Sequence, residues 1–235
     1  MNAQTQAEDR VSDRSSITAL IFDMDGLLVD SEPLSAEAMR RFLLSHGHEM
    51  RPATLDAALG RRLPEAIAAV AEVYALSHPL DELIAGFDAM RLEALRGNIV
   101  AMPGALAVLD WAERHHLSRA LATSSARPHA EVALAEAGLA GSFDVEVTGD
   151  EVDRGKPAPD LFLLAAERLG AEPASCLVIE DAPAGLEAAA RAGMRRVWVP
   201  NAQTRHLASP VSVDATLGSL LEAPALLRGW GIADN

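Results

Sequence analysis

From Met102 onward, short apolar runs alternate with longer stretches of helical composition. The runs typical of strands cover residues 119–123, 144–147, 176–180 and 195–199. The stretches typical of helices cover residues 105–116, 128–137, 159–169 and 183–192. Proline stands near the start of two of these helices, and glycine follows three of them, as helix boundaries favour. Strands that alternate with helices predict a parallel sheet with helices on both faces.

The first apolar run, residues 17–22, is followed by a region of different texture. The run is continuous and rich in β-branched and large apolar residues, which predicts a strand buried on both faces. Residues 33–97 contain little that resembles a strand. Residues 64–75 are rich in alanine, and apolar residues at 80, 83, 84 and 87 have helical spacing. We therefore predict an α/β fold: a Rossmann-like parallel sheet core with an inserted all-helical domain.

The same patterns predict the domain boundaries. Residues 1–16 are polar and predict a flexible tail. Residues 17–31 and 99–235 form the predicted α/β core, and residues 32–98 form the inserted helical domain. Beyond Pro200 we expect short helices that complete the edge of the sheet, and we expect no chemistry there.

Composition and net charge limit the kinds of molecule that the protein is expected to bind. The hydrophobic content of 49% is sufficient for a sizeable core, and 34 acidic against 20 basic residues give a net charge of −14. This charge argues against nucleic acid and against anionic membranes. We expect neither a transmembrane segment nor a signal peptide. The single cysteine, Cys176, lies in an apolar run and fits a reducing compartment. We therefore expect a cytoplasmic monomer that acts on a small molecule.

The first candidate for chemistry is Asp23-Met24-Asp25-Gly26, directly after the first strand. Because strand side chains alternate, two carboxylates separated by one residue leave the strand end in the same direction. Gly26 permits a sharp turn and a close approach to a ligand. Two like charges directed at one point are costly unless a cation or a proton lies between them.

Further polar residues follow other predicted strands. Thr123 and Ser124 end the second strand, Glu180 and Asp181 end the strand at 176–180, and Lys156 lies in a loop before a helix. Each has an ordinary interpretation, as a helix cap, an acidic turn or a solvated lysine. However, ligands of open α/β sheets bind outside the carboxyl ends of the strands. The joint placement of these residues therefore predicts a single site.

These four segments, in this order and spacing, resemble the four motifs of the haloacid dehalogenase-like superfamily. The resemblance covers roughly residues 17–200. The sequence DMDGLLVDSEP at residues 23–33 is similar to the branch that contains β-phosphoglucomutase and small sugar-phosphate phosphatases. The resemblance implies a helical cap inserted after the first motif, which agrees with the helical texture of residues 32–98.

The chemistry that these residues support is phosphoryl transfer. For Asp23 to attack a phosphate ester, each pair of unit charges at ~3.5 Å costs about 5 kcal/mol at an effective dielectric constant near 20. A Mg²⁺ ion bound by Asp23, by the backbone carbonyl of Asp25 and by Asp181 offsets this repulsion. Glu180 is expected to bind through water or from behind the direct ligands, and Lys156 neutralises the remaining charge.

The other site residues are expected to bind the phosphate and to transfer protons. The Thr123 hydroxyl and N–H groups near Ser124 hold the phosphate oxygens. Asp25 protonates the leaving group and then deprotonates the water that hydrolyses the aspartyl-phosphate. This acid function requires a raised pKa, which we expect from burial under a closed cap. We also expect the loop after Gly60 to present Arg61 or Arg62 to the substrate, although two solvated arginines are as compatible with the sequence.

We therefore predict a Mg²⁺-dependent phosphatase of small phosphorylated metabolites such as sugar or polyol phosphates. Dehalogenation uses the first aspartate without a metal, so Asp25 and the Glu180-Asp181 pair argue against it. A non-catalytic phospho-ligand-binding protein on the same fold is a further alternative. It would be favoured by loss of a motif residue, but the motif residues are all present.

The remaining alternative is a β-phosphoglucomutase. In that enzyme a histidine follows the first motif, and a cap-loop arginine holds the phosphate that is not transferred. The matching positions here are Ser35 and Leu63, which weakens the alternative. It remains open because Arg61 and Arg62 lie nearby.

Overall fold

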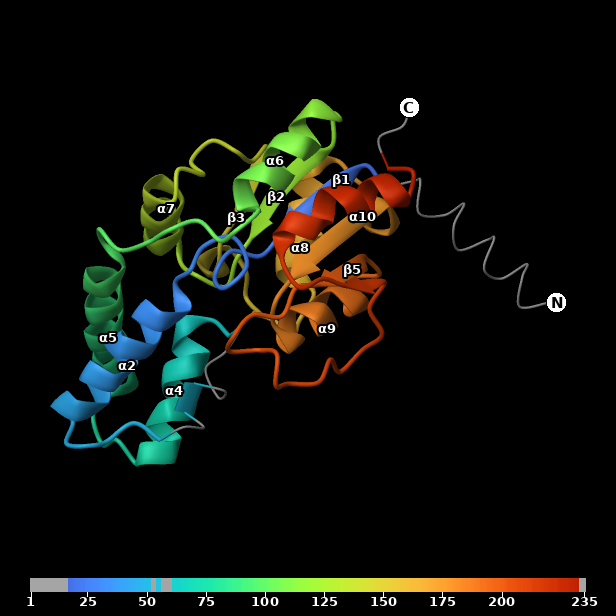
Figure 1. The fold of residues 1–235 in the computed structure, drawn as a ribbon. Helices are drawn as coiled ribbons and strands as arrows, with labels where there is room; N and C mark the ends of the chain where they lie inside the picture. The colour runs from blue at the N-terminus through green and yellow to red at the C-terminus, as the bar shows by residue number, and fades with distance from the viewer. Residues whose placement is uncertain (1–16, 52–53, 56–60, 233–235) are drawn as a thin grey trace.

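The computed structural model describes residues 17–51, 54–55 and 61–232, so the predicted tail at residues 1–16 lies outside the described residues. The described chain forms a parallel sheet of six strands in the order β3-β2-β1-β4-β5-β6 (Figure 1). The strands are β1 (Ala19–Phe22), β2 (Ser118–Ala122), β3 (Val145–Val147), β4 (Cys176–Glu180), β5 (Arg195–Trp198) and β6 (Ala215–Thr216). The predicted parallel sheet is confirmed.

Helices cover both faces of this sheet, as predicted. The core helices are α6 (Ala105–Arg114), α7 (Arg127–Glu136), α8 (Asp160–Leu169), α9 (Pro183–Arg191) and the short α10 (Ala223–Gly229). The first four begin and end within a few residues of the bounds predicted for them. The last segment supplies β6 and α10 and so completes the sheet edge. No helix among the described residues is long and apolar enough to cross a membrane.

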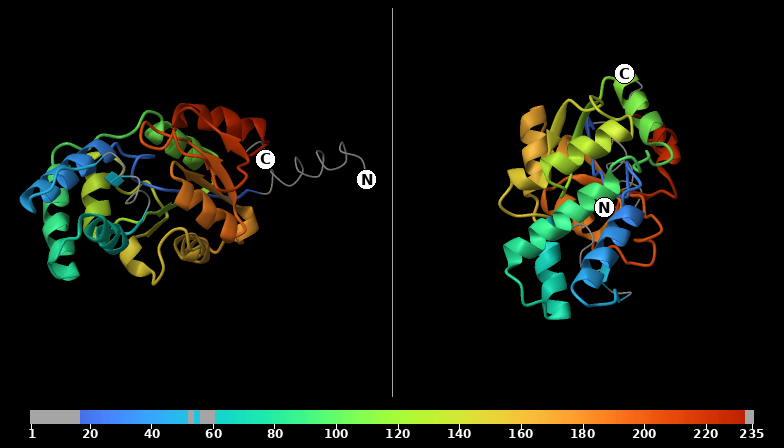
Figure 2. Two further views of the ribbon diagram at one scale, coloured as in Figure 1. Left: turned by 90° about the horizontal axis from the view of Figure 1, so that it is seen from below. Right: turned by 90° about the vertical axis from the view of Figure 1, so that its left-hand side faces the viewer.

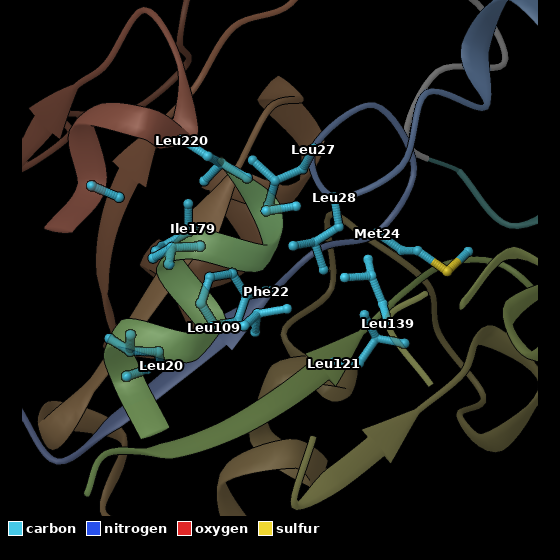
Figure 3. Close-up of a cluster of buried hydrophobic side chains, with 14 of the residues drawn as sticks. Leu20, Phe22, Met24, Leu27, Leu28, Leu109, Leu121, Leu139, Ile179 and Leu220 are labelled. Carbon is cyan, nitrogen blue, oxygen red and sulfur yellow. The ribbon is translucent and has the colours of Figure 1, made fainter. Parts of the chain in front are cut away.

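Alternation along the central strands divides the core into two apolar layers. Leu20 and Phe22 of β1 lie in one cluster with side chains of α6, α7 and α10 (Figure 3). Ala19 and Ile21 face the other way, into a second cluster with side chains of α8 and α9. All four side chains are buried. A strand buried on both faces has no polar positions, which explains the continuous apolar run in the sequence.

The inserted region, between β1 and α6, consists of α2 (Glu32–Ser45), α4 (Leu63–Tyr74) and α5 (Leu80–Leu95). These helices lie beside one end of the sheet rather than on its faces (Figures 1 and 2). They pack on one another through an apolar cluster of their own, which includes Phe42, Ile67 and Phe87. We call α2, α4 and α5 with their connecting loops the helical unit.

The sheet order positions the site. β1 is paired with β2 on one side and with β4 on the other, and both registers are parallel. The carboxyl ends of β1, β2 and β4 therefore lie together. Their loops open at the point where the strand order changes direction, which is the usual ligand position in sheets of this kind.

Gly104 lies where the start of α6 comes close to the backbone at Leu221, a distant segment of the chain. Gly104, before α6, has φ +93° and its missing Cβ would lie 2.3 Å from the Leu221 backbone nitrogen. Gly138 also has positive φ, but a Cβ there would meet nothing within 4 Å. We expect Gly138→Ala to lower the free energy of unfolding by about 1–2 kcal/mol, the cost of the left-handed backbone alone. We expect Gly104→Ala to lower it by at least about 2 kcal/mol more, because the backbone at Leu221 must shift.

Urea unfolding of the two variants measures this difference. Equal losses would contradict the close approach of the segment around Leu221 to the start of α6.

Candidate active site

The site is organised around one buried lysine. Lys156 lies in the loop before α8, and its Nζ donates hydrogen bonds to Asp23 Oδ1 at 2.6 Å and to Glu180 Oε1 at 2.7 Å. A third hydrogen bond, 3.1 Å long, reaches the Ala122 carbonyl at the end of β2. Lys156, Asp23 and Glu180 are all buried. One side chain thus joins the ends of β1, β2 and β4.

The acidic groups outnumber this lysine. Asp23, Glu180 and Asp181 each place a carboxylate oxygen within 4.8 Å of the others. Burial, followed by the charge of Glu180, raises the pKa of Asp181 well above its ordinary value. Burial also raises the pKa of Asp23 to about 8, although the neighbouring Lys156 acts in the opposite direction. Both shifts mean that Asp23 and Asp181, two of three buried carboxylates beside one ammonium group, hold protons unless a cation replaces them, and oxygen donors of this kind fit a hard divalent cation.

Asp25 differs from these three carboxylates in its surroundings. It accepts hydrogen bonds from Ser31 Oγ at 2.5 Å and from Ser125 Oγ at 2.6 Å, and Arg91 Nη2 lies 3.2 Å from its Oδ1. The sequence analysis expected burial to raise the pKa of Asp25. Burial does act in that direction, but Arg91 and the two hydroxyls outweigh it and lower the pKa. The expectation is wrong for this state because it ignored a cation on the helical unit.

The hydroxyl motif lies beside Asp25. Thr123 is fully buried, its Oγ1 accepts a hydrogen bond from the Ser125 backbone N–H at 3.0 Å, and it lies 3.5 Å from Asp25 Oδ2. Ser124 lines the cavity described below. Ser125, which the sequence analysis did not single out, makes the shorter contact with Asp25.

Two glycines allow the carboxylates to approach their surroundings. A Cβ on Gly185 would lie 1.7 Å from Glu180 Oε1, so only glycine fits beside this carboxylate. Gly26 has φ +77°, and a Cβ there would lie 2.5 Å from Asn201 Nδ2 and 2.8 Å from Asp181 Oδ2. The close approach predicted for Gly26 exists, but its partners are two protein side chains.

A cavity of about 110 Å³ lies between these residues and the helical unit. The core side includes Asp23, Asp25, Thr123, Ser124, Ser125, Glu180 and Asp181. The facing side combines apolar and polar side chains of the helical unit: Met39, Leu55, Leu63, Ala66, Phe87, Glu32, Ser35, Arg61 and Arg91. The cavity therefore has charged groups at its base and a mixed surface opposite them.

The two arginines expected to contact substrate differ in position. Arg61 is exposed and lines the cavity. Arg62 does not line the cavity; it forms an ion pair with Glu65 and donates a hydrogen bond to the Val152 carbonyl at 2.7 Å. It also packs over Gly155, where a Cβ would lie 2.8 Å from Arg62 Cγ. Arg62 thus connects the helical unit to the core.

Arg91 of α5 is a cavity residue that the sequence analysis missed. In addition to Asp25, it contacts Ser125 Oγ and Ser35 Oγ, each at 3.2 Å, and its side chain is only 14% exposed. It follows Phe87 by four residues and therefore continues the buried face of α5. The sequence contained a signal for this residue, because a charged side chain on the apolar face of a helix needs a polar partner.

Asn201 was also missed. It follows β5, in the segment where we expected no chemistry. Its Nδ2 donates a hydrogen bond to Asp181 Oδ2 at 2.8 Å and another to the Gly26 carbonyl at 3.0 Å. A single asparagine in a polar loop has no periodicity or motif that distinguishes it from a turn residue.

Comparison with known proteins agrees with this geometry. The family model described as haloacid dehalogenase-like hydrolase matches residues 17–193. A phosphorylated carbohydrates phosphatase of Thermotoga maritima is 35% identical over 77% of this chain and 83% of its own length. A fructose-1-phosphate phosphatase of Escherichia coli is 36% identical over 77% of this chain and 95% of its own length.

A longer relative and a solved structure are also similar. A bifunctional riboflavin kinase/FMN phosphatase of Arabidopsis thaliana is 32% identical over 92% of this chain, but the match spans only 56% of that protein. The crystal structure of CbbY from Rhodobacter sphaeroides in complex with phosphate superposes with a TM-score of 0.78 at 26% identity, covering 88% of this chain and 96% of that chain.

Glu32 at the start of α2 provides a test of the electrostatics of the cavity. Burial, followed by the charge of Asp25, raises its pKa from 4.5 to about 7. Between these two pH values the folded protein binds a proton that the unfolded chain has lost, so stability falls as the pH rises through this window. We expect Glu32→Gln to remove a pH-dependent loss on the order of 3 kcal/mol, since the shift from 4.5 to about 7 spans about 2.5 pKa units and each unit is worth about 1.4 kcal/mol.

Urea unfolding of the metal-free protein between pH 4 and 8 measures the effect, with Glu72→Gln at an exposed position of α4 as the control. Parallel stability curves for Glu32→Gln and the unsubstituted protein would contradict the assignment.

Proposed function

Because the chain belongs to the haloacid dehalogenase-like hydrolase family, we propose that it is a Mg²⁺-dependent phosphatase of small phosphorylated metabolites. The reaction passes through an aspartyl-phosphate on Asp23. The observation that carries this proposal is the buried contact of Lys156 with Asp23 and Glu180, with Asp181 beside them. Sugar or polyol phosphates are the proposed substrates.

Asp23 is the proposed nucleophile. Its carboxylate is held by Lys156 at the end of β1, so its direction is set before a substrate binds. Asp23, Asp181 and the backbone carbonyl of Asp25 would hold the Mg²⁺, with Glu180 bound through water. When bound, the ion supplies positive charge that offsets the repulsion between the Asp23 carboxylate and the phosphate. Lys156, Thr123 and N–H groups near Ser124 stabilise the charge on the transferred phosphoryl group.

Asp25 is the proposed acid and base. Ionised, as Arg91 favours, it is ready to deprotonate the water that hydrolyses the aspartyl-phosphate. To protonate the leaving group it must first carry a proton. Transfer of the Arg91 guanidinium from Asp25 to substrate oxygens would raise the pKa of Asp25, because a nearby cation is what lowers it.

The helical unit, predicted at residues 32–98, acts in this proposal as a cap over the site. Its polar groups at the cavity, Glu32, Ser35, Arg61 and Arg91, supply both donors and acceptors of hydrogen bonds. Such a mixture suits the hydroxyl groups of a sugar or polyol better than a second phosphate, which Glu32 would repel when ionised. The names of the relatives from Thermotoga maritima and Escherichia coli support the same substrate class.

The proposed setting is the cytoplasm, since the one cysteine is buried in β4 and cannot form an intramolecular disulfide. We propose a monomer as the acting form.

A panel of sugar and polyol phosphates assayed for released phosphate tests the function. We expect turnover that requires Mg²⁺ and that excess chelator abolishes. Asp23→Asn should lower kcat by at least about a thousandfold, because an amide can neither attack phosphorus nor bind the metal as well. Asp25→Asn should slow esters with poor leaving groups most, since its metal ligand is the backbone carbonyl.

Near-normal activity of Asp23→Asn, or full activity in chelator, would contradict the proposal. The mutase alternative is checked with β-glucose 1-phosphate and a trace of the 1,6-bisphosphate. If glucose 6-phosphate forms faster than phosphate is released, the protein is a mutase and the phosphatase proposal is wrong.

A second experiment tests the contact of Arg91 with substrate. We expect Arg91→Ala to lower kcat/KM for glycerol 3-phosphate roughly ten- to hundredfold, since a hydrogen bond from a charged group contributes about 1.5–3 kcal/mol. The loss should be smaller for methyl phosphate, which has no hydroxyl to bind. Arg96→Ala, at an exposed position just after α5, is the matched control. Equal losses for both esters would show that Arg91 acts only on Asp25.

A further inference from the structure

Asn201 contacts the site from outside the cavity. It lies in the loop after β5 and is half-buried. Its two amide N–H groups are both used: one bonds Asp181 Oδ2 and the other bonds the Gly26 carbonyl, at 2.8 and 3.0 Å. It therefore joins the loop after β5 to the loops after β1 and β4.

The orientation of this amide is fixed by its other end. Asn201 Oδ1 accepts hydrogen bonds from the backbone N–H groups of Gln203 at 2.8 Å and Thr204 at 3.1 Å. Backbone N–H groups can only donate, so the atom that faces them must be the oxygen, and Nδ2 must face Asp181. Thr204 is fully buried, and its Oγ1 lies 3.2 Å from Oδ1 and accepts from the Asn201 N–H at 2.9 Å. A rotated amide would lose the bonds from the two backbone N–H groups and the bonds to Asp181 and Gly26.

Asp181 is held at a second point as well. The Trp198 indole N–H donates a hydrogen bond to the Asp181 backbone carbonyl at 2.8 Å. Gly26 leaves room for the amide, since its Cβ would overlap Asn201 Nδ2. The backbone and one carboxylate oxygen of Asp181 are therefore both fixed by β5 and the loop that follows it.

We propose that Asn201 is a positioning residue that restricts Asp181 to metal binding through one oxygen and thereby favours Mg²⁺ over Ca²⁺. Mg²⁺ requires near-octahedral coordination at about 2.0–2.1 Å, whereas Ca²⁺ takes about six to eight oxygens and accepts bidentate carboxylates. An Oδ2 engaged by Asn201 disfavours the bidentate mode. The inference rests on the proposed function only in that Asp181 binds a divalent metal.

Calorimetric titration of the metal-free protein with Mg²⁺ and with Ca²⁺ tests the inference without an activity assay. Loss of a residue that orients a metal ligand typically weakens binding about 10- to 100-fold, and we expect Asn201→Ala to raise the Mg²⁺ Kd by that amount. The Ca²⁺ Kd should rise less, so that the ratio of the two constants shifts by about tenfold toward Ca²⁺. Asn98→Ala, an exposed asparagine that bonds only backbone carbonyls at the end of α5, should change neither constant.

Thr204→Val provides a second variant in case Asn201→Ala does not fold, as judged by circular dichroism. It keeps the amide of Asn201 and removes the hydroxyl that supports it, so we expect a smaller shift of the Kd ratio in the same direction. Constants within twofold of the unsubstituted protein, or equal weakening of both metals, would overturn the inference. Absence of Mg²⁺ binding by the unsubstituted protein would instead overturn the proposed metal site, and the inference with it.

Discussion

The arrangement of the site depends on one buried ammonium group. Lys156 is the partner of two buried carboxylates, Asp23 and Glu180, and it reaches them from a loop that belongs to neither strand. Removal of one member of a buried ion pair costs about 3–5 kcal/mol, because the other charge is left without a partner. The pairing of β1 with β4 and the position of the loop before α8 are therefore electrostatically linked. A site of this kind forms only when the fold is complete.

Four carboxylates lie close together at the site, and each has different hydrogen-bond partners. Lys156 holds Asp23 and Glu180, Asn201 and Trp198 hold Asp181, and Arg91 holds Asp25. The partners come from the core, from the loop after β5 and from the helical unit. Burial raises the pKa of Asp23 despite Lys156, whereas Arg91 and two serine hydroxyls outweigh burial and lower the pKa of Asp25, two residues away. For the proposed roles both shifts must be reversed: a cation bound beside Asp23 would lower its pKa, and loss of the Arg91 contact would raise that of Asp25.

The sequence was sufficient for the first five strands and for the residues at their ends, but not for the two-residue strand β6. Buried parallel strands have continuous apolar runs, and the placement of Asp23, Lys156 and Asp181 follows from topology. Arg91 and Asn201 could not be found in this way, because each acts through contacts between segments far apart in the chain. The direction of the pKa shift of Asp25 was misjudged for the same reason. Burial can be anticipated from a sequence pattern, but Arg91, the cation that outweighs burial, belongs to a distant segment of the chain.

Several of the contacts that join the helical unit to the core are polar, although Leu95 of α5 also lies in the apolar cluster of the core. Arg62 bonds the Val152 carbonyl, Asp88 lies 3.5 Å from His129, and Arg91 bonds Asp25 and Ser125. The helical unit buries its own apolar cluster among α2, α4 and α5, so separation from the core would expose little of that cluster. Hydrogen bonds at such an edge exchange with water at a net difference of only about 1 kcal/mol each. Under the proposed function, a substrate that reaches the buried carboxylates would replace some of these polar contacts, and Arg91 is the contact that links such a replacement to Asp25.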